Sequence, residues 1–162
     1  MSSKASIMGH PIHPMLIPFP IGLWVFSLVA DILYLLGYNP GWRWMAFWTL
    51  LAGCIGAVAA AIFGIIDWLT LKEREVKKIA DWHARLNVIA LLVFAASWYL
   101  RTTGGSRWVS GSLTVPVALS VLGVILIIIS GWLGGELVYK HGVAVSPQYD
   151  TGAEEVTKAR VS

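Results

Sequence analysis

Charged residues are scarce in this chain. Only 13% of its 162 residues are Asp, Glu, Lys or Arg, whereas 57% are hydrophobic. An average soluble domain carries about 25% charged residues, and a soluble domain of this length must cover its surface with polar groups. The composition therefore excludes an ordinary soluble globule and a disordered chain. It predicts an integral membrane protein.

Basic residues and cysteine are also few. The formal net charge is only +3. The Lys and Arg residues do not alternate with polar residues that could contact bases, which argues against nucleic-acid binding. The single cysteine, Cys54, gives no disulfide framework. It lies within an apolar segment, where packing is its simplest role.

Four apolar segments are each long enough to cross a bilayer, which takes about 20 residues of helix. They cover residues 15–36, 44–69, 80–100 and 115–139. Their apolar runs are continuous rather than alternating, which disfavours a barrel. The sequence thus predicts an all-α, four-helix transmembrane domain over residues 1–145, followed by a flexible polar tail over residues 146–162.

Lys and Arg gather at one end of the predicted bundle. Four spans place both termini on the same side, and most basic residues, including those of residues 72–78, fall on that side. Short loops rich in Lys and Arg stay in the cytoplasm. We therefore expect both termini on the cytoplasmic side of a bacterial inner membrane.

The histidines and two acids are expected together at this cytoplasmic end. Ionisable groups inside a membrane are costly and often functional, and imidazole with carboxylate suits transition metals. A pair of histidines can also hold a haem iron axially, and His13 and His83 are the candidates for haem b. The candidates for a bare metal ion are His10, His13, Asp67, His83, Glu136 and His141.

The alternative is that these polar residues bind no metal or haem and only form hydrogen bonds and ion pairs near the membrane surface. The spacing matches neither the HExxH helix of a zinc protease nor the Glu-x-x-His pairs of di-iron bundles. In that reading Asp67 pairs with Arg85 or caps a helix, and Glu136 pairs with Lys140 one turn away.

The chain also shows signs of an internal repeat. His83 follows His13 by 70 residues and Glu136 follows Asp67 by 69, with Arg-Trp pairs at residues 43–44 and 107–108. The pattern predicts two related helical hairpins about an axis along the membrane normal, with a chance match as the alternative.

The amino-terminal segment GHPIHPMLIPFPIG is rich in proline. Because proline disfavours helix at the preceding residue, we expect extended backbone at His10 and His13. Irregular backbone at membrane depth must be buried in protein or face a wet cavity. The segment is therefore expected to fold over the inner mouth of the bundle and to carry histidine toward Asp67 and His83.

Small residues recur at every fourth position on two of the helices. Such spacing lets helix backbones approach closely in lipid, either inside the bundle or across a homodimer. The residues are Gly56, Ala60 and Gly64 on the second span, and Gly131 and Gly135 on the fourth.

The opening GHPIHPMLIPFPIGLW and the closing GWLGGELVYKHGVAV resemble a bacterial membrane family of unknown function, catalogued as domain of unknown function 2231. The resemblance spans roughly residues 9–145 and implies a four-helix membrane domain. Members of that family also occur joined to Rieske-type iron–sulfur domains, and the architecture is similar to small membrane cytochromes b, which implies electron transfer. No Cys or His follows Val145, so any redox partner is expected to be a separate polypeptide.

Two functions therefore compete. The first is a redox-linked protein that holds haem b or a metal near its cytoplasmic face. The second is a non-catalytic accessory subunit of a larger membrane complex. A transporter using Asp31 and Asp67 ranks third, and an enzyme is disfavoured because no nucleophile elbow, phosphate loop or zinc-protease helix occurs.

Overall fold

The structure, a computed structural model, describes residues 3–103 and 112–145. Its helices are α1 (Ile12–Leu16), α2 (Pro18–Leu35), α3 (Gly41–Thr70), α4 (Arg74–Thr102) and α5 (Thr114–Tyr139). Four helical stretches are long and apolar enough to cross a membrane, with α1 and α2 together forming the first. The predicted four-helix membrane fold is thus confirmed, while the tail at 146–162 lies outside the described residues.

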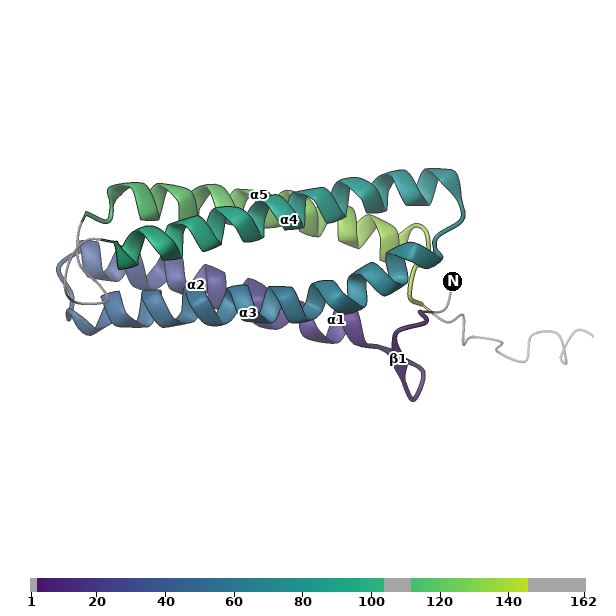
Figure 1. Cartoon of the computed structure of the whole chain (residues 1–162), viewed down its shortest axis with the longest axis horizontal. Coiled ribbons are helices and arrows are strands. Elements are labelled where there is room, and N and C mark those ends of the chain that lie inside the picture. The colour runs from purple at the N-terminus through teal and green to yellow at the C-terminus, as the bar shows by residue number, and fades with distance from the viewer. Residues whose placement is uncertain (1–2, 104–111, 146–162) are drawn as a thin grey trace, which may run out of the picture.

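The helices form two antiparallel hairpins that lie one over the other (Figure 1). One hairpin pairs α1 and α2 with α3, and the other pairs α4 with α5. The amino-terminal segment, the α3–α4 connection and the end of α5 share one end of the bundle, which we call the terminal end. The α2–α3 connection and the start of α5 mark the opposite, distal end.

The first span is interrupted at Ile17, between α1 and α2. Pro18 has no N–H to donate to the preceding turn, so the helix restarts there. The expectation of extended backbone holds for His10, which lies in β2 (His10–Pro11) and pairs with β1 (Ser6–Ile7). It is wrong for His13, which is helical, because Pro14 falls in the first turn of α1, where no N–H is needed.

The core between the hairpins centres on a stack of two aromatic rings. The rings of Trp24 in α2 and Phe94 in α4 lie 4.2 Å apart at 16°. Each ring also packs against a glycine of its own hairpin. A Cβ atom would come within 2.6 Å of the ring at Gly53 and at Gly123 alike, so only glycine fits.

Equivalent contacts recur at an interval of 70 residues. Ser27 Oγ donates to the carbonyl oxygen of Ala46 at 2.7 Å, and Ser97 Oγ donates to that of Pro116 at 2.8 Å. The glycine–aromatic contacts of the core obey the same interval. The internal repeat predicted from the histidines is therefore a structural one.

The acids are not part of that repeat. The 70-residue interval pairs Asp67 with Leu137 and Glu136 with Ile66, so the 69-residue match is out of register. Trp108 and its neighbouring arginine lie outside the described residues, and their spacing from the first Arg-Trp pair differs from 70. The predicted equivalence of the acids is thus wrong, because residues one apart on a helix point in different directions.

Candidate functional site

His13 is bound to the helix that follows it in the same hairpin. Its Nδ1 atom lies 2.8 Å from the carbonyl oxygen of Ala60 in α3. A carbonyl only accepts, so Nδ1 carries the proton and Nε2 keeps its lone pair. The ring lies against Gly64, where a Cβ atom would approach the imidazole Cε1 to 2.9 Å. The predicted small-residue spacing on this helix thus makes room for an imidazole.

His83 repeats this arrangement in the second hairpin. Its Nδ1 atom lies 2.9 Å from the carbonyl oxygen of Ser130 in α5. A Cβ atom at Gly134 would approach the ring to 3.0 Å. Gly134, rather than the predicted Gly131 and Gly135, is the glycine used for close packing here, since Gly131 has nothing within 4 Å.

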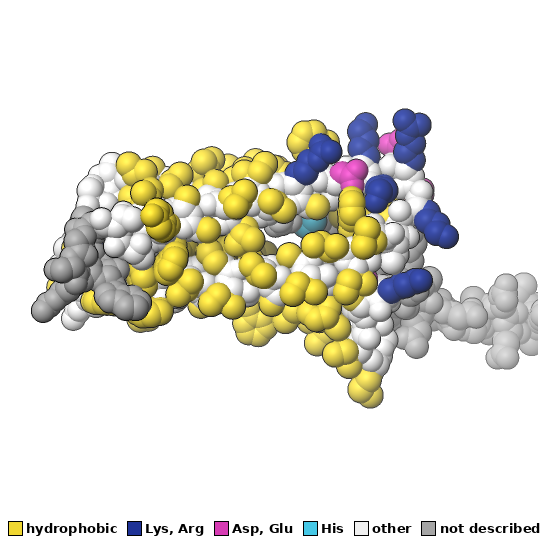
Figure 2. All heavy atoms as spheres, in the orientation of Figure 1, with side chains coloured by type: hydrophobic (Ala, Val, Ile, Leu, Met, Phe, Trp, Pro, Cys, Tyr) yellow, Lys and Arg dark blue, Asp and Glu magenta, His cyan; other side chains and the backbone are white. Residues whose placement is uncertain are grey.

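The two imidazoles occupy equivalent environments in the two hairpins. Both side chains are half-buried, and both lie toward the terminal end, on α1 and on the first half of α4. A histidine side chain is visible in the seam between the two hairpin layers in Figure 2. The structure therefore places the two residues predicted to hold haem at equivalent positions of the two hairpins, toward the same end of the bundle.

Asp67 has a different partner from the one expected. It accepts hydrogen bonds from Ser3 Oγ at 2.7 Å and from the backbone N–H of Ala5 at 3.3 Å. Residues that precede the proline-rich segment thus fold onto this end of α3, whereas the segment expected to do so is mostly helical from Ile12 onward. Arg85, the partner considered for Asp67, instead lies over the ring of Trp82, with 5.4 Å between its guanidinium carbon and the ring centroid.

The remaining candidates have local contacts. Glu136 forms the expected ion pair with Lys140 at 2.9 Å. His10 is exposed, with Nδ1 3.2 Å from the carbonyl oxygen of Met8, and His141 is half-buried near Glu136. Over the described ranges, no three His, Cys, Asp or Glu side chains gather as a metal ion would require.

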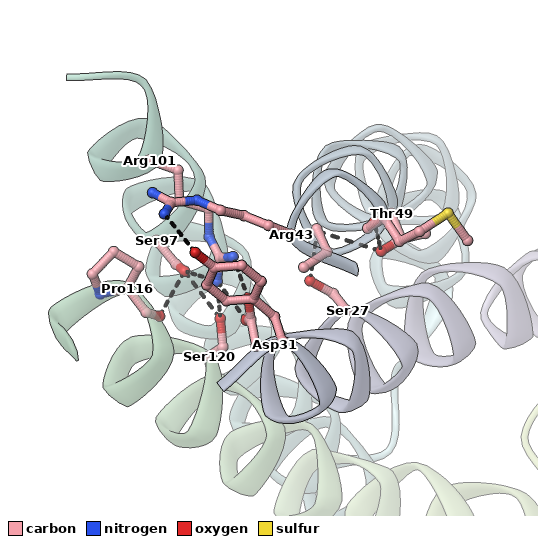
Figure 3. A network of polar contacts seen from close by, with 11 residues as sticks. Ser27, Asp31, Arg43, Thr49, Ser97, Arg101, Pro116 and Ser120 are labelled. Carbon is pink, nitrogen blue, oxygen red and sulfur yellow. Dashed lines mark hydrogen bonds and ion pairs between the residues drawn. The ribbon is translucent and has the colours of Figure 1, made fainter. Parts of the chain in front are cut away.

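A second polar cluster, which the sequence analysis does not predict, lies at the distal end (Figure 3). Asp31 of α2 and Arg101 of α4 are fully buried and form two parallel hydrogen bonds of 2.7 Å. Ser97 and Ser120 lie within 3.4 Å of the same guanidinium. The two charges are 70 residues apart, so extending the histidine interval to Asp31 would have found its partner.

A shallow cavity of about 290 Å³ opens elsewhere, on the outer side of α4 and α5. Neither histidine of the pair lines it. Its walls are Glu75, Lys78, Ile79, Trp82, Leu86 and Leu133.

These features define a class: a four-helix membrane protein made of two related hairpins, with an ion pair at one end of the interface and two imidazoles at the other. A family model described as predicted membrane protein, DUF2231, matches residues 9–147. The chain therefore belongs to this family, as its end motifs indicated. No curated protein and no solved structure matches it significantly.

Proposed function

We propose that this protein is a membrane electron-transfer protein that holds haem b between His13 and His83. The observation that carries the proposal is the repeated imidazole site. In both hairpins the ring sits on a glycine and Nδ1 donates to a helix carbonyl. That bond fixes the tautomer in which Nε2 is a ligand, as in metal-bound histidines generally.

The number of ligands favours haem over a bare ion. Zinc, manganese and non-haem iron sites usually take three or more protein ligands, and the described residues offer no such group. A porphyrin supplies four equatorial nitrogens, so the protein need provide only two axial ones. His13 and His83, on different helices, would supply these two ligands.

The chain's own residues would bind and insulate the group. Haem b, when bound, supplies one-electron exchange at its iron. Ala60 and Ser130 hold the two imidazoles through their carbonyl oxygens. The stacked rings of Trp24 and Phe94 and the buried Leu50 fill the interface toward the distal end and would keep water from reaching the group from that side.

The basic residues give the proposed orientation. Lys and Arg side chains gather at the terminal end in Figure 2, and such residues are retained in the cytoplasm. We place the terminal end, and with it the histidine site, on the cytoplasmic side of an inner membrane. The orientation is tested by labelling single cysteines placed at Lys72 and at Asn39 in a Cys54→Ala background. A cysteine at position 72 should react from the cytoplasmic side. Reaction from that side at position 39 alone would contradict the proposed orientation.

The haem proposal is tested by spectroscopy on protein purified from cells supplied with a haem precursor. We expect a Soret band and, on reduction, the sharp α-band of six-coordinate low-spin haem, with about one haem per chain by pyridine haemochrome assay. His13→Ala and His83→Ala should each lose the low-spin spectrum. His10→Ala and His141→Ala, matched histidine controls at the same end, should keep it.

Two results would overturn the proposal. One is a colourless protein that also fails to take up added hemin in detergent. The other is a haem spectrum that survives both His13→Ala and His83→Ala. Metal analysis of the same preparation would show whether a bare ion takes the place of haem, which would also reject it. An intact complex of colourless protein with larger partners would favour the accessory-subunit function.

A further inference from the structure

The two imidazoles differ in one respect, which the repeat makes visible. The Nε2 atom of His83 lies 3.1 Å from the side-chain Nδ2 of Asn87, one turn further along α4. The position equivalent to Asn87 in the first hairpin is Ile17, which has no donor. Accordingly, the structure shows no hydrogen bond to Nε2 of His13 from the part of the chain it describes.

The hydrogen bonds around Asn87 fix the direction of this contact. Asn87 Nδ2 lies 2.9 Å from the carbonyl oxygen of His83, which can only accept, so this atom is the amide nitrogen. His83 Nδ1 donates to the carbonyl of Ser130. The neutral ring therefore has its lone pair on Nε2, and Asn87 donates to that lone pair.

Asn87 can release this contact without being left unpaired. Its Nδ2 also lies 2.7 Å from Ser130 Oγ, so two N–H hydrogens serve three acceptors. Turning away from Nε2 leaves the bonds to Ser130 Oγ and to the His83 carbonyl. In the first hairpin Ala60 occupies the position of Ser130, so both the amide and its alternative acceptor are specific to His83.

We propose that Asn87 is a positioning residue that caps the ligand atom of His83 and controls its availability, while His13 stays open. This inference rests on the proposed haem site. In the cofactor-free protein His13 is the first ligand to bind, and His83 binds when the Asn87 amide moves to Ser130.

The cap itself is tested without haem, by modification with diethyl pyrocarbonate. This reagent transfers an ethoxycarbonyl group to an unprotonated imidazole nitrogen and releases carbon dioxide and ethanol. Site-specific rates are measured by peptide mass spectrometry on haem-free protein in detergent. We expect His83 to react about threefold to tenfold more slowly than His13, a factor matching the net strength of one hydrogen bond.

Two variants test whether the Asn87 amide itself slows the modification of His83. Asn87→Leu keeps the branched shape of the side chain and removes the donor, so the rate at His83 should rise about threefold to tenfold while that at His13 stays unchanged. Ser130→Ala keeps the amide on Nε2 and should leave the rate at His83 low. Equal rates at the two histidines in the wild type would overturn the cap, even if a variant failed to fold.

The link to ligand binding is tested by adding hemin to the same haem-free proteins. The Soret band of the bis-histidine form should grow about threefold to tenfold faster in Asn87→Leu than in the wild type. A faster chemical modification with unchanged hemin kinetics would reject control of binding by Asn87. If the wild type takes up no hemin at all, the proposed function fails, and the modification rates still decide whether Asn87 caps His83.

Discussion

The two ends of the hairpin interface place different kinds of residue at the equivalent positions of the two hairpins. At the distal end, equivalent positions carry opposite charges, Asp31 and Arg101, which satisfy each other by two hydrogen bonds. At the terminal end, equivalent positions carry the same residue, His13 and His83, and each imidazole bonds within its own hairpin. The charges of the first pair neutralise each other, whereas the second pair leaves Nε2 of His13 with no hydrogen bond from the described residues and Nε2 of His83 with the Asn87 amide alone.

We interpret the distal ion pair as a contact that stabilises the fold and the terminal histidines as a binding site. Complementary charges at equivalent positions require two different hairpins, because two identical hairpins would bury two like charges. Identical imidazoles at equivalent positions suit a ligand that would present the same atom to both hairpins, as the iron of a porphyrin would. The comparison predicts that substitutions at the distal end change stability and that those at the terminal end change binding.

The largest effect is expected from breaking the buried ion pair. Asp31→Ala leaves the Arg101 guanidinium buried without its counter-charge, which should cost about 3–5 kcal/mol in the free energy of unfolding. Denaturant unfolding in detergent measures the loss. Glu136→Gln breaks the exposed pair with Lys140 and should leave stability unchanged, since solvent screens such pairs. A loss near zero for Asp31→Ala would show that the buried pair does not hold the hairpins together.

Exchanging the two charges tests the symmetry directly. The double variant Asp31→Arg with Arg101→Asp places each charge at the equivalent position of the other hairpin. It should recover most of the stability lost in Asp31→Ala. Recovery should be incomplete, because Ser27 replaces Ser97 near the moved guanidinium but Leu50 replaces Ser120. A double variant no more stable than Asp31→Ala would mean that the positions are not interchangeable.

Overpacking the core should affect both hairpins alike. Gly53→Ala and Gly123→Ala each place a Cβ atom 2.6 Å from an aromatic ring of the central stack, and should each cost about 1–3 kcal/mol. Thermal unfolding of the two variants provides the measurement. Gly131→Ala, at a glycine with nothing within 4 Å, is the control. Strongly unequal costs at Gly53 and Gly123 would contradict the equivalence of the two hairpins in the core.

The sequence predicts the spans well because apolar runs of that length have few alternatives. It also predicts the histidine pair, because identical residues at a fixed interval are visible in one chain. The partner of Asp31 is missed because Asp and Arg at equivalent positions do not look like a repeat, although the 70-residue interval of the histidines leads from Asp31 to Arg101. Nor does the sequence predict the contacts of Asp67, since backbone donors such as that of Ala5 carry no residue-specific signal.

Removing the histidines should leave the fold intact. His13→Ala removes one hydrogen bond to a carbonyl, and His83→Ala removes one such bond and the bond from Asn87, which corresponds to about 1–2 kcal/mol in haem-free protein. That cost is well below the loss expected for Asp31→Ala, although both pairs lie at the hairpin interface. Unfolding of the haem-free proteins makes the comparison. A loss as large as that of Asp31→Ala would make the histidines structural and count against a ligand site.

The smallest effect expected is the coupling between the two histidines in haem-free protein. Because each imidazole bonds to its own hairpin, the costs of His13→Ala and His83→Ala should add within about 0.5 kcal/mol at a pH where both rings are neutral. The matching cycle at Asp31 and Arg101 should show strong coupling, since those side chains bond to each other. Adding hemin should introduce coupling at the histidine end alone, because one ligand then joins both hairpins. Strong coupling without hemin would show that the imidazoles already satisfy each other, and the contrast between the two ends would disappear.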